Sequence, residues 1–292
     1  MKPILDIGVL CVIVLMTAAV GMELEQQHFR AVTRRRPLLL LSLAGQAVVL
    51  PALGFALAHA MALPANIGAG ILLLAACPVG DIANFYTLMA RANLALSVAL
   101  NAISIALSAA TMALVFAAYE RLLGAQFLFA VPTPDLLLQS ALTLVLPLLA
   151  GMALRRFGPS VVARYGRALR LIVLAGIACL LALILLSQRE QLAAEWKLTG
   201  AAAAAFTGLA LVAGLSLAWL LRLSEDDTFT IGVGFAARNV AMATAIAVTL
   251  LGRLEYAVFA AVYFLAEVPL LLGAVAVYRK WRKPAALSEW LS

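Results

Sequence analysis

The sequence is short of the residues from which metal and nucleophilic sites are most often built. Its 292 residues include only two histidines and three cysteines, and charged residues make up 12% of the chain. The cysteines, Cys11, Cys77 and Cys179, stand singly in apolar sequence, without CxxC or Cys/His spacing. These absences exclude a disulfide framework and a zinc site held by cysteine and histidine, and no certain metal site is predicted.

Apolar residues, in contrast, are in excess. Hydrophobic residues make up 65% of the chain and the mean hydropathy is +1.06, far above the range of soluble domains. We therefore expect an all-α membrane protein, a single domain over 1–292 in the inner (plasma) membrane with the lipid bilayer around it. The net charge of +7 does not predict a nucleic-acid partner, because the basic residues lie in short loops between apolar runs.

Runs of about 20 apolar residues predict nine transmembrane helices. The first run lacks a basic cluster before it and leads into more membrane sequence, so we interpret it as a retained span rather than a signal peptide. The nine runs are 4–22, 37–60, 66–90, 93–118, 134–154, 169–187, 199–221, 228–251 and 254–279.

The distribution of Lys and Arg predicts the orientation of the chain. The loops 23–36 and 155–168 and the tail from 279 onward are basic and fall on one side of the nine-helix arrangement. With Arg91 and Arg222, and with Arg170 just after the second loop, that side carries fifteen basic residues, against five on the other side. Because positive loops stay cytoplasmic, we expect the N-terminus outside and the C-terminus in the cytoplasm.

Two of the runs are interrupted by helix-breaking and polar residues, at 77–84 (CPVGDIAN) and at 232–239 (GVGFAARN). In lipid every backbone N–H and C=O must be satisfied internally, so such residues are tolerated at membrane depth mainly where broken helices line a protein-enclosed cavity. One broken helix in each half of a membrane chain is typical of secondary transporters with a midplane binding site.

Nine spans place the two broken helices in opposite orientations, as an inverted repeat requires. We expect a first repeat over 1–118, one span short, and a second repeat over 134–280, followed by a cytoplasmic tail at 281–292. Alternating access between the two sides of the membrane is the transport mode that this symmetry favours.

At the two breaks the chain resembles the bile acid:sodium symporter family, and the likeness extends through most of the sequence. The first crossing region of the family is matched by 77–84 and 93–100, and the second by 232–243. Earlier matches are Gly21, Met22, Glu23 and Leu24, then Phe29, Arg30, Arg36 and Pro37, and the segment 46–51. The resemblance implies the nine-span form of the family, with a panel domain packed on a core domain in which two broken helices cross.

The resemblance also implies substrates and ion ligands. Family precedent allows bile-acid-like steroids, keto acids and related carboxylates. Gln46, Asn84 and Ser97 stand at positions of sodium ligands in the family, and they are residual sodium ligands together with Asn101, which stands where a threonine is usual. Ala83 stands where a serine is usual.

The largest departures from the family lie in the second break. The shared sodium-binding glutamate aligns with Gly234, and the glutamine that follows it aligns with Arg238. Sodium requires several oxygen ligands, and a guanidinium supplies donors only. Ordinary two-sodium coupling is therefore not expected. Coupling to protons through Asp81 or Glu267, or passive exchange, is the alternative, and no other cofactor is predicted.

An arginine near the midplane requires an anion, because its burial without one costs at least a few kcal/mol. Asp81, in the other break, is the first candidate partner of Arg238, and Glu267 in the last span is the second. In one interpretation Arg238 supplies a fixed positive charge where sodium sits in relatives and meets Asp81 or the substrate's carboxylate. In the other it forms a static salt bridge that holds the crossing together.

The remaining polar residues each allow a structural and a functional interpretation. Asn84 and Asn239 follow the breaks at matching places and can either bind a ligand or satisfy freed backbone groups. Gln46 and Ser97 can be interhelical hydrogen-bonding residues instead of ligands. Glu267 lies deep in an apolar span, where a carboxyl group can act as a proton carrier.

The function predicted from these residues is secondary transport of a small or amphipathic organic anion, a carboxylate, with Arg238 and the positive ends of half-helices in the binding site. Cys77 beside a break leaves an arsenite-efflux carrier as an alternative. An intramembrane aspartyl protease requires a second acid and a Gly-x-Gly-Asp motif, and a zinc protease requires His-Glu-x-x-His; both are absent, so no enzyme is predicted. A channel is disfavoured because no repeated selectivity loop is present.

Overall fold

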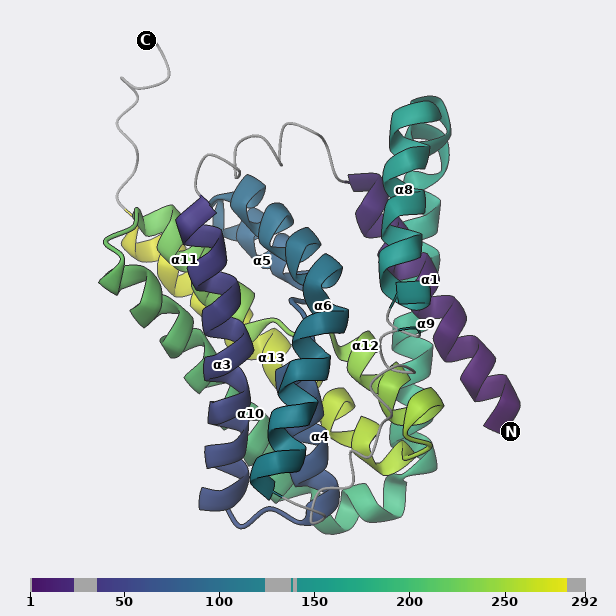
Figure 1. Ribbon diagram of the computed structural model, residues 1–292, viewed down its shortest axis with the longest axis vertical. Helices are drawn as coiled ribbons and strands as arrows, with labels where there is room; N and C mark the ends of the chain where they lie inside the picture. The colour runs from purple at the N-terminus through teal and green to yellow at the C-terminus, as the bar shows by residue number, and fades with distance from the viewer. Residues whose placement is uncertain (1, 24–35, 124–137, 139–140, 283–292) are drawn as a thin grey trace.

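The computed structural model is almost entirely helical (Figure 1) and describes residues 2–23, 36–123, 138 and 141–282. Most of the basic loop 23–36, the motif residues Phe29 and Arg30, and the tail from 283 onward lie outside the described residues. The elements are α1 (Lys2–Glu23), α3 (Arg36–Ala60), α4 (Ala65–Ala76), α5 (Ile82–Ala90), α6 (Leu94–Leu123), the π-helical turn η2 (Ala141–Val145), α8 (Leu146–Phe157), α9 (Pro159–Ser187), α10 (Arg189–Leu220), α11 (Glu225–Ala236), α12 (Val240–Ala245), the π-helical turn η3 (Ile246–Leu250) and α13 (Leu254–Trp281).

Helices occupy all nine apolar runs, wherever these runs are described. Within the described part of the chain, three helical stretches are long and apolar enough to cross a membrane, namely 40–60, 192–220 and 254–281. Counting two sharply bent pairs, 94–119 and 141–166, as one span each raises that number to five. A multi-pass helical membrane protein is therefore supported, and the number of nine spans stays a prediction.

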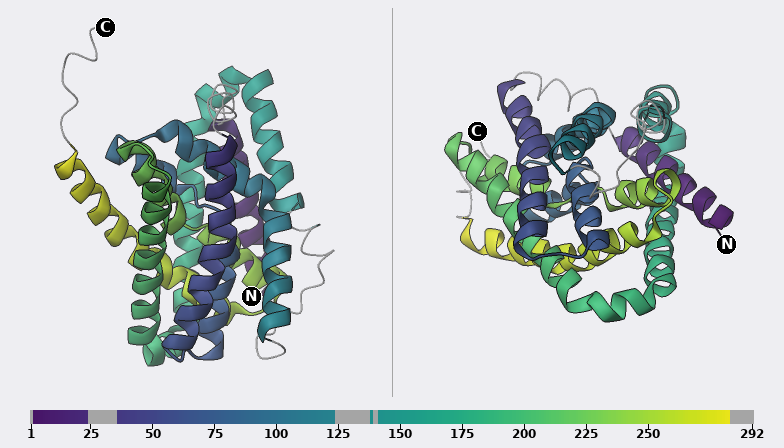
Figure 2. Two further views of the ribbon diagram at one scale, coloured as in Figure 1. Left: turned by 60° about the vertical axis from the view of Figure 1, so that its left-hand side comes forward. Right: turned by 60° about the horizontal axis from the view of Figure 1, so that its bottom comes forward.

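Two groups of helices are visible in Figures 1 and 2. α1, α8 and α9 pack on one another along one side, and the remaining helices surround α4 and the two breaks. The contact between α1 and α8 is backbone to backbone, since a Cβ at Gly21 would collide with the Leu148 carbonyl and one at Gly151 with the Ala18 carbonyl. Small residues allow this close approach, as is common between membrane helices.

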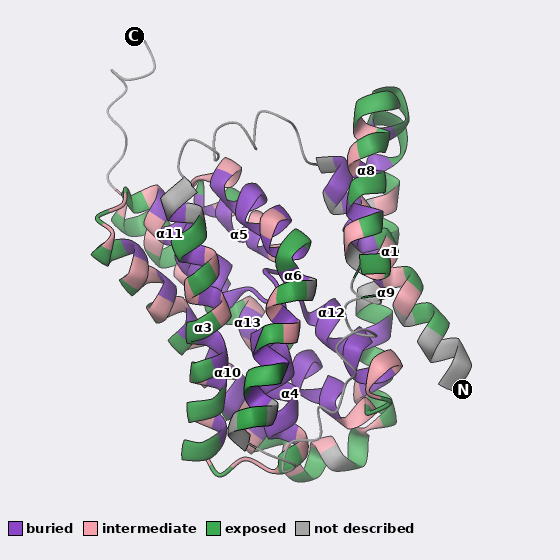
Figure 3. Ribbon diagram, in the orientation of Figure 1, coloured by how far each residue is buried: buried purple, intermediate pink, exposed green. Residues whose placement is uncertain are grey.

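Burial is concentrated in α4, α11 and α12, the helices that end or begin at the breaks on the buried side (Figure 3). Every residue of α4 from 67 to 76 is buried, as are all six residues of α12 and those of α11 from 229 to 236. Large apolar side chains are instead exposed on the outer helices, for example Leu40 and Val48 of α3 and Leu114 of α6. This distribution fits lipid-facing outer helices around a protein-enclosed centre.

Candidate functional site

The two predicted breaks are present, and they meet. α4 ends at Ala76 and α5 begins at Ile82, while α11 ends at Ala236 and α12 begins at Val240. The extended residues between them form an antiparallel bridge that pairs Val79 with Arg238.

Backbone groups freed by one break are satisfied by the other. The Gly80 N–H donates to the Ala237 carbonyl at 2.8 Å, and the Asn239 N–H donates to the Pro78 carbonyl at 3.0 Å. Each missing partner would leave a buried backbone group at a cost of about 1–3 kcal/mol, so each break stabilises the conformation of the other.

Gly80 and Ser104 fit the first break to its surroundings. A Cβ added to Gly80 would lie 2.5 Å from the Arg238 carbonyl oxygen, so only glycine allows the two broken segments to approach this closely. The Val79 N–H donates to Ser104 Oγ at 3.1 Å, and the Ser104 hydroxyl donates to the Asn101 carbonyl at 2.8 Å. Sequence reasoning did not select Ser104, because a serine in a long apolar helix carries no distinguishing signal.

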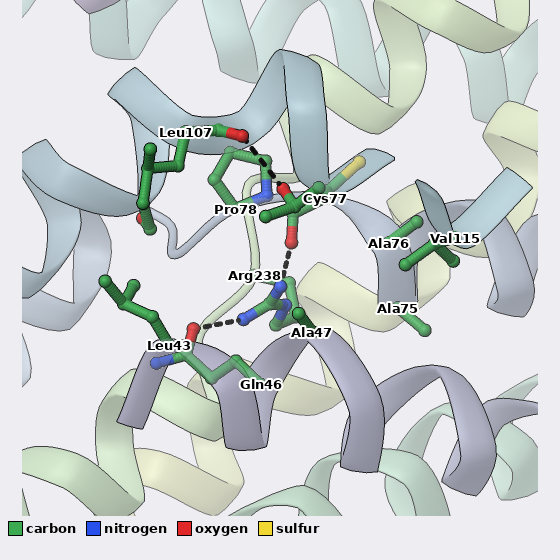
Figure 4. Close-up of a pocket in the computed structure, with 12 residues that line it drawn as sticks. Leu43, Gln46, Ala47, Ala75, Ala76, Cys77, Pro78, Leu107, Val115 and Arg238 are labelled. Carbon is green, nitrogen blue, oxygen red and sulfur yellow. Dashed lines mark hydrogen bonds between the residues drawn. The ribbon is translucent and has the colours of Figure 1, made fainter. Parts of the chain in front are cut away.

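The Arg238 side chain is buried, with 3% of its surface exposed, beside the crossing (Figure 4). Its guanidinium donates to Gln46 Oε1 at 3.0 Å and to the Cys77 carbonyl, while its Nε has no hydrogen-bond partner within the described part of the chain. Cys77 is the C-cap of α4, so the guanidinium lies at the negative end of that helix dipole. A helix end stabilises a cation by about 0.3–2 kcal/mol.

The expected pairing of Arg238 with an acid is wrong in this structure. Arg238 forms no ion pair with Asp81, Glu267 or any other carboxylate among the described residues; its two acceptors are neutral oxygens. Asp81 instead accepts a hydrogen bond from Asn101 Nδ2 at 2.8 Å. The physical reason is that the two side chains extend in different directions. The guanidinium extends toward α3 and the end of α4, and the Asp81 carboxylate extends toward α6.

Four of the predicted site residues form a polar cluster between α5 and α6. Besides the bond between Asn101 and Asp81, the Ser97 hydroxyl donates to Asn84 Oδ1 at 2.8 Å. Asn101 Oδ1 is buried without a hydrogen-bond partner among the described residues. A sodium ion needs several oxygens at once. The oxygens of Asp81 and Asn84 each accept a hydrogen bond from a neighbouring side chain, so both are already oriented within the cluster. Sodium binding by these four residues stays a prediction.

Asn239 has a structural role at the second break. Its Oδ1 accepts the Met242 backbone N–H at 2.9 Å and so caps the first turn of α12. This bond satisfies a backbone group freed by the break, as one of the two interpretations of Asn239 predicted. Asn84, in contrast, directs its Oδ1 to Ser97 rather than to the backbone.

Glu267 lies in α13 with none of its surface exposed. Neither carboxylate oxygen has a hydrogen-bond partner in the structure as described. Tyr263, one turn earlier on α13, donates its hydroxyl to the Ala236 carbonyl at the end of α11. Sequence reasoning missed this anchor, because an aromatic residue in an apolar helix is most often simple core packing.

A pocket opens between α3, the end of α4 and α6, and Arg238 lies in its wall (Figure 4). Its empty volume, including the part open to solvent, is about 370 Å³. Gln46, Cys77 and Arg238 supply the polar groups of the lining together with Ser104 and Thr111, and the rest is mainly aliphatic. A concave apolar pocket with a few convergent polar groups is the usual form of a small-molecule site.

Comparison with known proteins gives consistent results. Residues 9–195 match the model of the sodium bile acid symporter family. An uncharacterized sodium-dependent transporter of Bacillus subtilis (strain 168) is 26% identical over 227 residues, which cover 78% of this chain and 69% of the relative. A probable chloroplastic sodium/metabolite cotransporter of rice is 32% identical over 28% of this chain and 20% of the relative. Another, of Arabidopsis thaliana, is 31% identical over 37% of this chain and 26% of the relative.

Proposed function

Because the chain belongs to the sodium bile acid symporter family, we propose that it is a secondary carrier of a small organic anion, a carboxylate, which binds at Arg238. The observation that carries this proposal is a buried guanidinium with neutral acceptors only, in the wall of a pocket. Desolvating a charge costs several kcal/mol, and the helix end at Cys77 returns at most about 2 kcal/mol of that. A carboxylate in the pocket would supply the missing charge.

The geometry also supports transport without the usual sodium coupling. Gln46 stands at the position of a family sodium ligand, and here its amide oxygen accepts a hydrogen bond from Arg238. The guanidinium thus takes over an oxygen that a cation would need. With a fixed charge in place of the ion, we propose coupling to protons, or exchange of one anion for another.

The proposed architecture is the nine-span form of the family. We propose that α1, α8 and α9 form a panel and that the helices around the crossing form the core of two inverted repeats, 1–118 and 134–280. The separate packing of the two helix groups supports this division. The excess of Lys and Arg in alternate loops supports an external N-terminus and a cytoplasmic C-terminus in the plasma membrane.

The pocket is small in this arrangement, since its whole empty space is about 370 Å³ with the part open to solvent included. We therefore propose a short keto acid rather than a steroid acid as the substrate. A steroid acid would require a wider opening between the helices.

Proteoliposomes test the proposal directly. Labelled pyruvate and labelled cholate are offered to vesicles that contain the purified protein, first in counterflow and then with an imposed sodium gradient or an imposed proton gradient. We expect saturable exchange of pyruvate, accumulation driven by protons, and no stimulation by sodium. Accumulation against a gradient also excludes a channel or a protease, since neither concentrates a solute.

Two sodium-ligand variants sharpen this experiment. If sodium strongly stimulates uptake, and Gln46→Ala or Asn84→Ala abolishes that stimulation, then the ion site survives and the assignment of Arg238 is wrong. If the protein exchanges neither carboxylate although it is folded and reconstituted, the proposed substrate class fails.

A further inference from the structure

Glu267 is a buried acid that the proposed anion site does not use. It is completely buried within α13, and both of its oxygens lack hydrogen-bond partners in the described part of the chain. The hydroxyl of Tyr86 in α5 is also buried and also lacks a partner. Buried polar atoms are nearly always paired, so a buried acid and a buried phenol that both lack partners require an explanation.

The charged surroundings of Glu267 are simple. Its electrostatic neighbours are Arg238 at the crossing, Tyr86 of α5 and Tyr263 of its own helix. Of the other elements packed against α13, the helices α4 and α12 and the turn η3 contain no ionisable residue, and no ionisable group of α9 or α10 acts on Glu267 among the described residues. Glu267 therefore faces one cation and two phenols.

The other acids near α13 are engaged elsewhere. Those of α11 lie in its first turn, where Asp226 forms an ion pair with Arg282 at 3.0 Å and accepts a hydrogen bond from Tyr278. Arg282 lies fifteen residues beyond Glu267, which is about 22 Å along a helix. This cluster lies at the C-terminal end of α13, and Glu267 is the acid of α13 that acts electrostatically on Arg238.

An ionised carboxylate without donors is very costly in an apolar interior. In the arrangement described, Glu267 therefore needs either a bound proton or a cation as its partner. The one cation close to it, Arg238, donates instead to Gln46 and to the Cys77 carbonyl. A proton is the smallest species that meets the requirement.

The helix that carries Glu267 is able to bend there. Pro269, two residues further along α13, has no N–H to donate to the Leu265 carbonyl, so one backbone hydrogen bond is missing in the turn that contains Glu267. Kinks in long helices occur at such positions. A small bend at this turn moves the carboxyl group relative to the crossing.

We propose that Glu267 is the proton-binding site of the carrier and that Arg238 is its partner when the proton leaves. This inference rests on the proposed function. With Arg238 bound to Gln46, a proton from water forms an O–H bond on a carboxylate oxygen of Glu267. In the other arrangement the guanidinium turns to Glu267, that O–H bond breaks, and the proton returns to water on the opposite side. One proton with one monovalent carboxylate moves no net charge.

Glu267→Gln separates coupling from substrate binding. We expect this variant to lose accumulation of pyruvate or cholate, whichever the wild-type carrier exchanges, when a proton gradient is imposed. Counterflow exchange without a gradient should persist at a measurable rate, because a neutral side chain still permits the cycle with substrate bound. Glu255→Gln is the matched control: Glu255 lies in the first turn of the same helix, in an exposed ion pair with Arg253, and its loss should leave accumulation intact.

The outcomes distinguish this inference from the proposed function. Exchange with proton-driven accumulation that survives Glu267→Gln overturns the role of Glu267 and leaves the anion carrier standing. Accumulation that a sodium gradient drives, with no response to a proton gradient, likewise overturns the role of Glu267 and leaves the anion carrier standing. If wild type exchanges no carboxylate, the proposed function fails, and proton binding at Glu267 is then decided without substrate.

Dicyclohexylcarbodiimide provides that substrate-free measurement, because it enters apolar regions and reacts with protonated carboxyl groups. We expect mass spectrometry of the intact carrier in lipid to find the adduct on Glu267, with less adduct as the pH is raised, and to find none on that peptide in Glu267→Gln. Glu267→Asp should retain both the adduct and part of the accumulation. Absence of the adduct from wild type at all pH values, together with adducts on partly exposed acids such as Glu255, would contradict a protonated Glu267.

Discussion

The two breaks share a backbone arrangement and differ in their charged side chain. Each interrupts an apolar helix for a few residues, and backbone hydrogen bonds on both sides of the paired residues Val79 and Arg238 join the two breaks. The first carries Asp81, which accepts a hydrogen bond from Asn101 in the neighbouring helix α6. The second carries Arg238, which has neutral acceptors only.

This difference distinguishes the groups that hold the crossing together from the group that we propose binds the substrate. The crossing is held by two backbone hydrogen bonds and by the bond from the Arg238 side chain to the Cys77 carbonyl, none of which uses a carboxylate, so acid and base are not needed to pair across it. The acid accepts a hydrogen bond from an amide in its own half of the chain, whereas the base has only neutral acceptors among the described residues and, under the proposed function, pairs with the carboxylate of the substrate. Removing the charge of Arg238 should therefore affect transport most, and removing the charge of Asp81 should lower the stability of the protein only slightly.

The largest expected effect comes from Arg238→Gln. Losing one member of a buried, hydrogen-bonded charge pair with the substrate costs about 2–5 kcal/mol, so KM for carboxylate exchange should rise at least about 30-fold. Arg238→Lys keeps the positive charge but lacks the planar guanidinium, so its KM should lie between those of wild type and Arg238→Gln. Counterflow at a range of pyruvate concentrations measures both variants.

Arg222→Gln is the control for the change of charge, since Arg222 lies in the turn between α10 and α11, away from the pocket lining. A wild-type KM in Arg238→Gln, with the variant properly folded, would show that the substrate does not meet the guanidinium.

Intermediate effects on stability are expected from the glycines of the two breaks. Gly80→Ala places a Cβ against the Arg238 carbonyl and should destabilise the protein by about 1–3 kcal/mol, as overpacking does. Gly234→Ala meets nothing within 4 Å and lies inside α11, so it should be neutral or stabilising by up to about 1 kcal/mol. Thermal unfolding of the two variants in one detergent gives the comparison, and equal Tm values would mean that the crossing is not closely packed.

The smallest effect is expected from Asp81→Asn. An amide oxygen can still accept from Asn101, so the loss should be about 1 kcal/mol, the difference between a charge-assisted and a neutral hydrogen bond. Removing one member of a buried ion pair would instead cost about 3–5 kcal/mol. In the double variant with Arg238→Gln, the two changes in the free energy of unfolding should add to within about 0.5 kcal/mol. If the double variant is instead more stable than Asp81→Asn alone, then Asp81 and Arg238 do form an ion pair.

The positions of the breaks could be predicted from sequence because they depend on local chemistry. Proline, glycine and polar residues in apolar runs pointed to 77–84 and 232–239, and the helices stop at Ala76 and Ala236. The capping role of Asn239 follows from the same local rule, since its amide reaches a backbone N–H three residues away.

The partners of the charged residues could not be predicted in the same way. Gln46 lies 192 residues before Arg238, and the rotation of α3 that brings its amide to the guanidinium is set by packing of whole helices. The Cys77 carbonyl is a backbone atom and has no sequence signature as an acceptor. Opposite charge made Asp81 the obvious partner, but it says nothing about the direction in which each side chain extends.

The hydrogen bonds of the crossing also have a consequence for the synthesis of the protein. Cys77 and Arg238 are 161 residues apart, so the first break is made long before the chain that completes it. At about 5–20 residues per second, its carbonyl and amide groups wait roughly 10–30 s for their partners. During that interval the translocon, water or another protein must provide hydrogen-bond partners for the backbone groups between α4 and α5. A ribosome that stalls in this interval leaves these groups without their native partners.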